Sequence, residues 1–280
     1  MRKSIAGLIA LTLLALAGVA SAEPCRYSAP RTVDLDAATL KSLLLILGPT
    51  DAHVRGVAGL SQVEVRGTAC ASNPDWLQDL RIDTSRSGDD AAVTVRTADH
   101  GMSFGLLGLS RYAYMKLTVS VPLRLAVAID SGSGDVVAET LAALDFHSGS
   151  GDLKASDISG PLALQVSSGD VDARRVGSVQ LRSTGSGDVT VSEVHGDVHA
   201  DRAGSADLHF SDVEGSVWVG SIGSGDLRLE SISHDVDVGG IGSGDVVVDD
   251  VGGDLKVGAA GSGDVSYHGV KGTVHVPKGD

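Results

Sequence analysis

Aspartate recurs at intervals of 17 to 19 residues through the second half of this sequence, each time directly before Val or Leu. Such a row of carboxylates could bind Ca²⁺, because hard cations prefer oxygen ligands. It could also be structural, with each carboxylate accepting hydrogen bonds from turn N–H groups or from a neighbouring serine hydroxyl. The row consists of Asp135, Asp152, Asp170, Asp188, Asp207, Asp226, Asp245 and Asp264.

The spacing of the aspartates favours the structural role over a metal site. Known Ca²⁺-binding solenoids repeat a nonapeptide with more glycines and with aspartates at other positions. We therefore predict no cofactor and no metal ligand, and keep a Ca²⁺-stabilised repeat protein as an alternative.

A carbohydrate-active β-helix enzyme is a second alternative. Its catalytic carboxylates would occupy positions that break the repeat, because an acid and a base or nucleophile need different surroundings. The aspartates here are periodic, and aromatic residues make up only 3% of the chain. We therefore predict that the protein is not an enzyme and assign no catalytic residue.

Each aspartate belongs to a longer repeated unit with two short alternating runs. A Val or Leu follows every aspartate, another aliphatic residue stands five positions later, and a second alternating pair such as Val217 and Val219 comes next. Short aliphatic runs bounded by Gly, Ser and Asp are typical of β-strands. A serine stands two residues before every aspartate: Ser133, Ser150, Ser168, Ser186, Ser205, Ser224, Ser243 and Ser262.

A steady period of this kind indicates one supersecondary unit stacked many times. The sequence predicts an all-β fold in which residues 126–280 form a single-stranded β-solenoid of about eight 17–19-residue coils. Equivalent residues such as Val246 and Val265 should then lie over each other. The turn glycines are replaced once each, by Ser167 and Ala206, whereas Ser and Asp are never replaced. We therefore expect side-chain hydrogen bonds of Ser and Asp to define the turn.

The N-terminus has the pattern of a secretory signal peptide over residues 1–22. Arg2 and Lys3 precede an apolar run, and Ala20-Ser21-Ala22 is a cleavage pattern that predicts a cut between Ala22 and Glu23. The expected location is therefore periplasmic or secreted, with no membrane span in the mature chain. The formal net charge of −14 argues against nucleic acid as a partner.

Residues 23–125 lack the clear period and are predicted to form a β-rich N-terminal capping region. This region holds both cysteines, Cys25 and Cys70, which in an exported protein should form one disulfide. Residues 43–65 repeat the solenoid spacing and are interpreted as a degenerate coil. The alternative for this part is a short helix over residues 36–47.

Two features depart from the repeat and are candidate surface contacts. Trp218 falls on an outward position between His199 and Asp237 of the adjacent coils, and an exposed Trp is a common recognition anchor. Phe104 lies in the apolar stretch over residues 102–109. This stretch either packs on the solenoid end or contacts a partner.

The repeats resemble those of the bacterial β-strand-repeat family of putative adhesins, a domain family of unknown function, and are similar to the head domain of autotransporter adhesins. The resemblance covers about residues 40–280. It depends on repeats such as Gly223-Ser224-Gly225-Asp226-Leu227 and on Val119-Ser120-Val121-Pro122 before the array. It implies an exported, non-catalytic solenoid that acts as a scaffold or binding module of the cell envelope, with an envelope protein or a glycan as partner. The resemblance transfers no catalytic residue.

Overall fold

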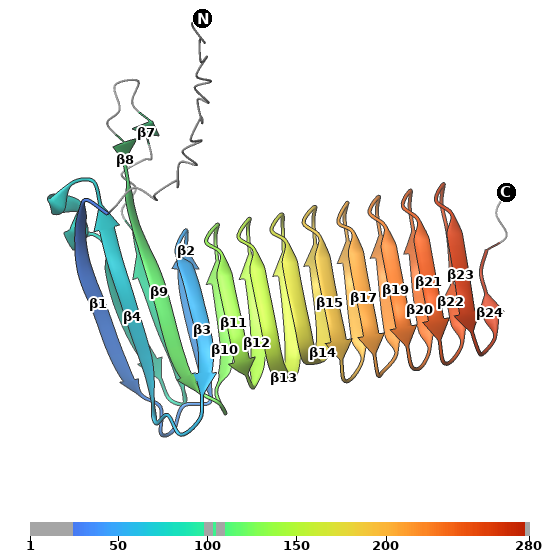
Figure 1. Ribbon diagram of the computed structural model, residues 1–280, viewed down its shortest axis with the longest axis horizontal. Helices are drawn as coiled ribbons and strands as arrows, with labels where there is room; N and C mark the ends of the chain where they lie inside the picture. Colours follow the sequence, from blue (N-terminus) through green and yellow to red (C-terminus); the bar gives the residue numbers. More distant parts are fainter. Residues whose placement is uncertain (1–24, 98–102, 105–109, 278–280) are drawn as a thin grey trace, which may run out of the picture.

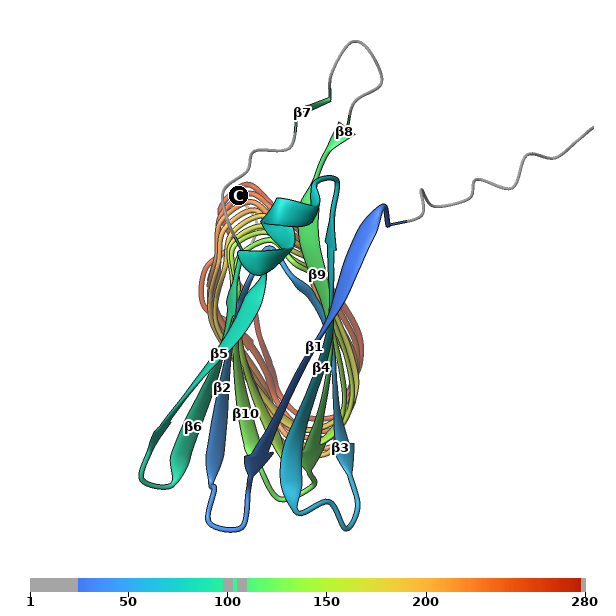
Figure 2. The same ribbon diagram turned by 90° about the vertical axis from the view of Figure 1, so that its left-hand side faces the viewer.

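The computed structural model describes residues 25–97, 103–104 and 110–277. The chain forms a β-solenoid whose coils stand side by side from the blue N-terminal end to the red C-terminal end in Figure 1. Twenty-two strands form one continuous sheet that winds into two walls. Viewed along the axis, the walls enclose a narrow oval (Figure 2). The predicted β-solenoid of about eight turns is therefore confirmed.

Each coil contributes one strand to each wall, and strands of neighbouring coils pair in parallel. The first wall contains, in spatial order, β1 (Tyr27–Asp36), β4 (Gln62–Ala71), β9 (Ala113–Pro122), β3 (Asp51–Val57), β11 (Val136–Leu141), the first halves of β13 (Leu153–Val166) and β14 (Val171–Thr184), β15 (Val189–Val194), β17 (Leu208–Val213), β19 (Leu227–Ile232), β21 (Val246–Val251) and β23 (Val265–Val270).

The second wall begins with two strands of the N-terminal region and continues to the C-terminal end. It contains β5 (Arg81–Ser87), β6 (Asp90–Arg96), β2 (Ser42–Gly48), β10 (Ala126–Ser131), β12 (Ala143–Ser148), the second halves of β13 and β14, β16 (Val198–Ala203), β18 (Val217–Ile222), β20 (Val236–Ile241), β22 (Leu255–Val257) and β24 (Val274–His275). A short 3-10 helix, η1 (Pro74–Gln78), precedes β5.

Aliphatic side chains fill the space between the walls. In β21 the residues alternate between buried and outward positions, and Val246 pairs directly with Val265 of the next coil, as predicted. The largest buried side chains of the solenoid are Phe146 and Phe210, both fully shielded from solvent. Because a coil buries its apolar side chains only against its neighbours, the coils are stable as a stack and not singly.

The glycine that precedes seven of the eight aspartates is explained by close approach of successive coils. A Cβ atom placed on Gly225 would lie 1.8 Å from the carbonyl oxygen of Ala206, and one on Gly244 would lie 1.9 Å from that of Gly225. None of these seven glycines has a positive φ. The turn therefore selects glycine for inter-coil space and not for a left-handed backbone.

A left-handed residue does occur once in each coil, just before the last buried aliphatic of the first-wall strand. Its φ lies between 53° and 59° at seven non-glycine positions, where it turns the chain toward the second wall. Only the last coil uses glycine here, at Gly269, with φ 71°. The seven residues are Thr140, Asp157, Arg175, Glu193, Asp212, Ser231 and Asp250.

The N-terminal strands extend both walls beyond the regular coils. β2 pairs in parallel with β10 and β3 with β11, so residues 42–57 form a coil that precedes the array. Residues 42–48 are a strand, and the helix alternative over residues 36–47 does not hold. Beyond this coil, β9, β4 and β1 pair antiparallel on the first wall, and β6 and β5 do so on the second.

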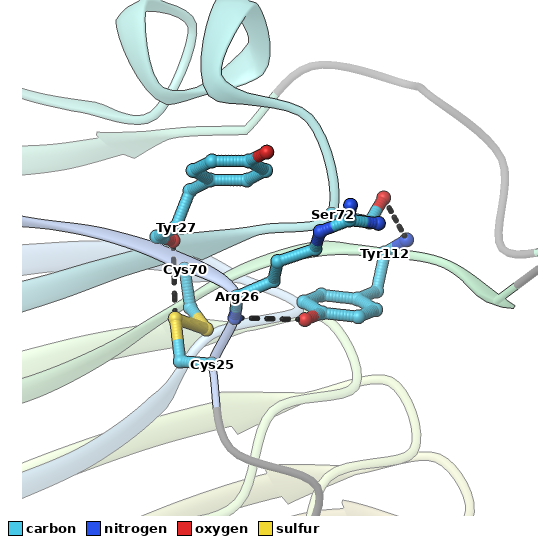
Figure 3. The surroundings of a disulfide bond; sticks show 6 residues. All are labelled: Cys25, Arg26, Tyr27, Cys70, Ser72 and Tyr112. Carbon is cyan, nitrogen blue, oxygen red and sulfur yellow. Dashed lines mark hydrogen bonds between the residues drawn. A yellow bond between two sulfur atoms is a disulfide. The ribbon is translucent and has the colours of Figure 1, made fainter.

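A disulfide between Cys25 and Cys70 fixes the start of β1 to the end of β4, with 5.7 Å between the Cα atoms. The backbone N–H of Arg26 donates to the hydroxyl of Tyr112, and the N–H of Tyr112 donates to the hydroxyl of Ser72 (Figure 3). The expected disulfide is therefore present, and hydrogen bonds beside it join the same end of the fold.

Some predicted features lie outside the described residues. These are the signal peptide over residues 1–22 and most of the apolar stretch over residues 102–109. Within the described ranges, no helix has the length and apolar character needed to cross a membrane.

Candidate functional site: the aspartate ladder and the outward walls

The aspartate row is a hydrogen-bonded ladder along the edge where first-wall strands begin. The carboxylate Oδ1 of Asp226 accepts the backbone N–H of Asp245 at 2.8 Å, while the N–H of Asp226 donates to Oδ1 of Asp207 at 2.8 Å. The same bond recurs at every step from Asp51 to Asp264, with lengths of 2.8 to 3.3 Å. The longest step leads to Asp207, which follows Ala206, the one alanine in place of the turn glycine.

The ladder supports the structural role that the sequence favoured. Each carboxylate up to Asp245 accepts a backbone N–H of the next coil, which the turn would otherwise leave without a partner. Among the described residues, no group of three or more His, Cys, Asp or Glu side chains is arranged to hold a metal ion.

Within the described residues, the serines of the motif do not make the side-chain hydrogen bonds that were expected to define the turn. The side chains of all eight serines are exposed, and the contact to the preceding coil is made by the backbone, as when the N–H of Ser243 donates to the carbonyl of Gly223 at 2.9 Å. In three coils an inward Ser or Thr, four positions before the aspartate, makes a further side-chain hydrogen bond within the turn. Ser148 Oγ donates to the carbonyl of Gly151 at 2.8 Å, and Thr184 Oγ1 to that of Gly187 at 3.1 Å.

A second, interrupted ladder lines the opposite edge and was missed from the sequence. Oδ1 of Asp235 accepts the N–H of Asp254 at 2.8 Å, and Oδ1 of Asp254 accepts the N–H of Thr273 at 2.7 Å. These hydrogen bonds from Thr273, first from its backbone and then from its side chain, lower the pKa of Asp254. In each of these coils an Asp, or a Ser or Thr in its place, stands directly before the second-wall strand, and this pattern is the sequence signal for the second ladder.

The outward faces of the walls carry charged pairs that differ from coil to coil. On the second wall, Arg182 holds Asp145 with two hydrogen bonds, Nη1 to Oδ1 at 2.8 Å and Nη2 to Oδ2 at 3.0 Å. This hydrogen bonding lowers the pKa of Asp145. On the first wall, Arg175 binds Asp157 at 2.7 Å and likewise lowers its pKa.

Trp218 lies on the outward side of β18, between His199 of β16 and Asp237 of β20. Its side chain is 38% exposed, and its ring stacks on that of His199 with 4.0 Å between centroids and 10° between planes. His199 Nε2 lies 2.8 Å from Oδ1 of Asp201. Trp218 is therefore covered on one ring face by His199 and is otherwise partly exposed.

Phe104 belongs to a short hairpin, in which β7 (Ser103–Phe104) pairs antiparallel with β8 (Ser110–Arg111). Its side chain lies outside what the structure describes, so its role as a surface contact stays a prediction. Residues 101–105, Gly-Met-Ser-Phe-Gly, also match the Gly-x-Ser-x-Gly motif of serine esterases. That motif acts in a strand-to-helix turn, whereas Ser103 lies in a hairpin strand.

The depressions on the first wall are shallow and are lined by residues with structural partners. One of about 340 Å³ is lined by Asp152, Asp170 and Asp188, together with Lys154 and Asp172. Three of these carboxylates already accept ladder hydrogen bonds. This depression offers no carboxylate pair in singular surroundings, and the enzymatic alternative is unsupported.

Comparison with known proteins identifies the class of domain. Residues 77–212 match the family model described as Toastrack DUF4097. This part of the chain, just under half of its length, is similar to Toastrack domains, and the resemblance to a β-strand-repeat family is confirmed. The match ends within β17, and the coils from β18 onward continue the same register outside it.

Three solved structures are similar to this chain at low sequence identity. A protein described as a "putative lipid binding protein" from Parabacteroides distasonis has a TM-score of 0.50 and 15% identity, over 88% of this chain and 96% of that one. A "putative adhesin" from Bacteroides fragilis has a TM-score of 0.36 and 15% identity, over 90% and 98%. A "putative cell adhesion protein" from Clostridium sporogenes has a TM-score of 0.34 and 11% identity, over 89% and 100%. A search of the curated proteins finds no significant match.

Proposed function

We propose that this protein is an exported, non-catalytic binding module of the bacterial cell envelope, and that it binds an envelope protein or a glycan through the outward walls of its solenoid. The observation that carries this proposal is that the repeated residues hold the coils together, while the residues that vary face outward. The repeated aspartates form hydrogen bonds between coils, whereas the residue types at the outward wall positions vary along the stack. A rigid, non-repeating surface of this kind suits recognition.

Export is supported by the pattern of residues 1–22 and by the disulfide between Cys25 and Cys70. Disulfides persist in oxidising compartments such as the periplasm. N-terminal sequencing of the protein isolated from an expressing bacterium should begin at Glu23.

Binding is tested by cosedimentation of the purified protein with isolated envelope fractions, namely peptidoglycan sacculi and membrane vesicles. The expected result is saturable binding to at least one fraction. Two double variants each replace a charged outward pair with serine. One changes Asp145 and Arg182 on the second wall, and the other changes Asp157 and Arg175 on the first wall. One of the two should weaken binding while both keep the circular dichroism of the native chain. Binding to no fraction above the level of an unrelated acidic protein would refute the proposal.

A further inference from the structure

The aromatic stack on the second wall ends in an open ring face. Trp218 has one face against His199, and in the coil that follows its in-register neighbour is Asp237, which pairs with Lys256 and not with the indole. A Cβ atom placed on Gly220 would lie 2.8 Å from Cη2 of Trp218, so the outer part of the indole extends along the strand over Gly220. In the next coils the positions beside it are Gly239 and Gly258, both exposed.

These glycines are required by the close approach of neighbouring backbones, and their lack of a side chain leaves the space beside the indole free. A Cβ atom on Gly239 would lie 2.4 Å from the carbonyl oxygen of Gly220, and one on Gly258 would lie 2.4 Å from that of Gly239. Side chains are therefore excluded here, while neighbouring strands are about 4.8 Å apart. The ring face thus borders a strip at Gly239 and Gly258, on two successive strands of the wall, that carries no side chains.

Polar groups border this strip on one side. Asp237 pairs with Trp218 in register, and Lys256 pairs with Asp237. Lys256 Nζ lies 2.9 Å from Oδ2 of Asp237, and the two side chains are 60% and 40% exposed. The pair presents hydrogen-bond acceptors and donors together, next to a flat apolar surface.

We infer that the outward-facing part of the Trp218 ring is a subsite for one pyranose ring of a glycan that runs along the strip of Gly239 and Gly258. A pyranose has an apolar C–H face that stacks on an aromatic ring and a rim of hydroxyls that needs both donors and acceptors. The border of Asp237 and Lys256 meets the second requirement. An acyl chain or an aliphatic peptide side chain would find no further apolar side chain on this strip.

This inference rests on the proposed function and names the class of partner. Its test uses Trp76→Phe, because the chain has two tryptophans and this variant leaves Trp218 as the sole indole fluorophore. The protein is titrated with soluble tetrasaccharides, namely chitotetraose, cellotetraose and maltotetraose, and with choline as a cationic probe of the same ring face. At least one tetrasaccharide should shift the Trp218 emission in a saturable manner.

Three variants in the wild-type background make the assignment specific, with calorimetry as the readout. Trp218→Ala should weaken the binding of that sugar at least tenfold, Trp218→Phe should keep most of it, and Asp237→Asn should weaken it less than Trp218→Ala does. Saturation by choline with no response to any tetrasaccharide would overturn the inference in favour of a cation site. So would equal sugar binding by wild type and Trp218→Ala, or no emission change with any probe.

The two proposals can fail separately. Envelope binding that Trp218→Ala leaves unchanged would retain the proposed function and reject the pyranose subsite. A sugar response without binding to any envelope fraction would retain the subsite and reject the envelope role.

Discussion

Each ladder aspartate satisfies an N–H group that the turn leaves without a backbone partner. Asp226 shows both halves of the arrangement, since its N–H donates to Asp207 and its Oδ1 accepts from Asp245. The arrangement places like charges on successive coils, and each neighbouring pair repels by about 1 kcal/mol in water. The acceptor, and not the charge, is therefore the property that the turn requires.

This argument predicts opposite results for two substitutions of Asp226. Asp226→Ala removes the acceptor for the Asp245 N–H and should lower the free energy of unfolding by about 1 kcal/mol. Asp226→Asn keeps an acceptor oxygen and removes a repelling charge, so it should change stability by less than about 0.5 kcal/mol. Urea unfolding followed by circular dichroism measures both. Equal losses in the two variants, together with a midpoint raised by calcium and lowered by chelator, would instead indicate a bound cation.

The left-handed residue of each coil imposes a different constraint. Ser231 has a φ of 58°, a conformation in which β-branched residues are strongly disfavoured. Ser231→Val should therefore destabilise the protein by about 1 to 2 kcal/mol, although Val favours strands elsewhere. Ser211, an outward residue of β17 with extended backbone, provides the matched control. Thermal unfolding should show Ser211→Val unchanged or slightly stabilised, and a similar loss in both variants would contradict the backbone explanation.

At the scale of elements, one ion pair joins strands that are not neighbours. Asp145 of β12 pairs in register with Ala163 of β13, and Ala163 pairs with Gln180 of β14. Arg182 of β14 nevertheless reaches Asp145 with both terminal nitrogens. The small side chain of Ala163 leaves the path open. The pair therefore fixes three successive strands of the second wall.

The pKa of Asp145 is lowered mainly by its hydrogen bond from Arg182, so this carboxylate stabilises the fold when ionised. Its contribution is present above the ordinary value of 3.8 and is lost as the pH falls through the lower pKa of the folded state. Because both side chains are more than one third exposed, screening limits the contribution at pH 7 to about 1 kcal/mol or less.

Asp145→Asn should therefore lose stability at pH 7 and show a shallower decline below pH 4. Urea midpoints measured between pH 7 and pH 3 give this profile. An acid limb that is equally steep in Asp145→Asn and wild type would show that the pair contributes nothing.

The sequence predicts a repeated structural feature when the same residue types recur with it. It does not predict a feature whose backbone geometry recurs while the residue types vary. Val246 over Val265 and Trp218 beside His199 follow from the period alone. The left-handed column could not be foreseen, because Thr140, Arg175 and Glu193 share no chemical signature. The second ladder was hidden because Ser216 and Thr273 interrupt its aspartates, and the pair of Asp145 and Arg182 was hidden because it skips a coil.

At the scale of the whole molecule, coils that contact only their neighbours make stability local. In such stacks a lost contact destabilises nearby units first and reaches distant ones only weakly. The N-terminal end differs from the rest, because β1, β4 and β9 pair antiparallel and the disulfide joins two of them. The effect of breaking that bond should therefore show how far cooperativity extends along the solenoid.

Replacing Cys25 and Cys70 with serine should destabilise the N-terminal strands selectively. The bond joins residues 45 apart, which in the chain-entropy model corresponds to about 4 kcal/mol. Hydrogen exchange measured by mass spectrometry should show faster exchange in β1, β4 and β9, with β17 to β21 unchanged. Reduction of the wild-type protein should reproduce the pattern, since it breaks the same bond without substitution. Faster exchange spread evenly to β21 would mean that the solenoid unfolds as one unit, and the nearest-neighbour description of the stack would have to be abandoned.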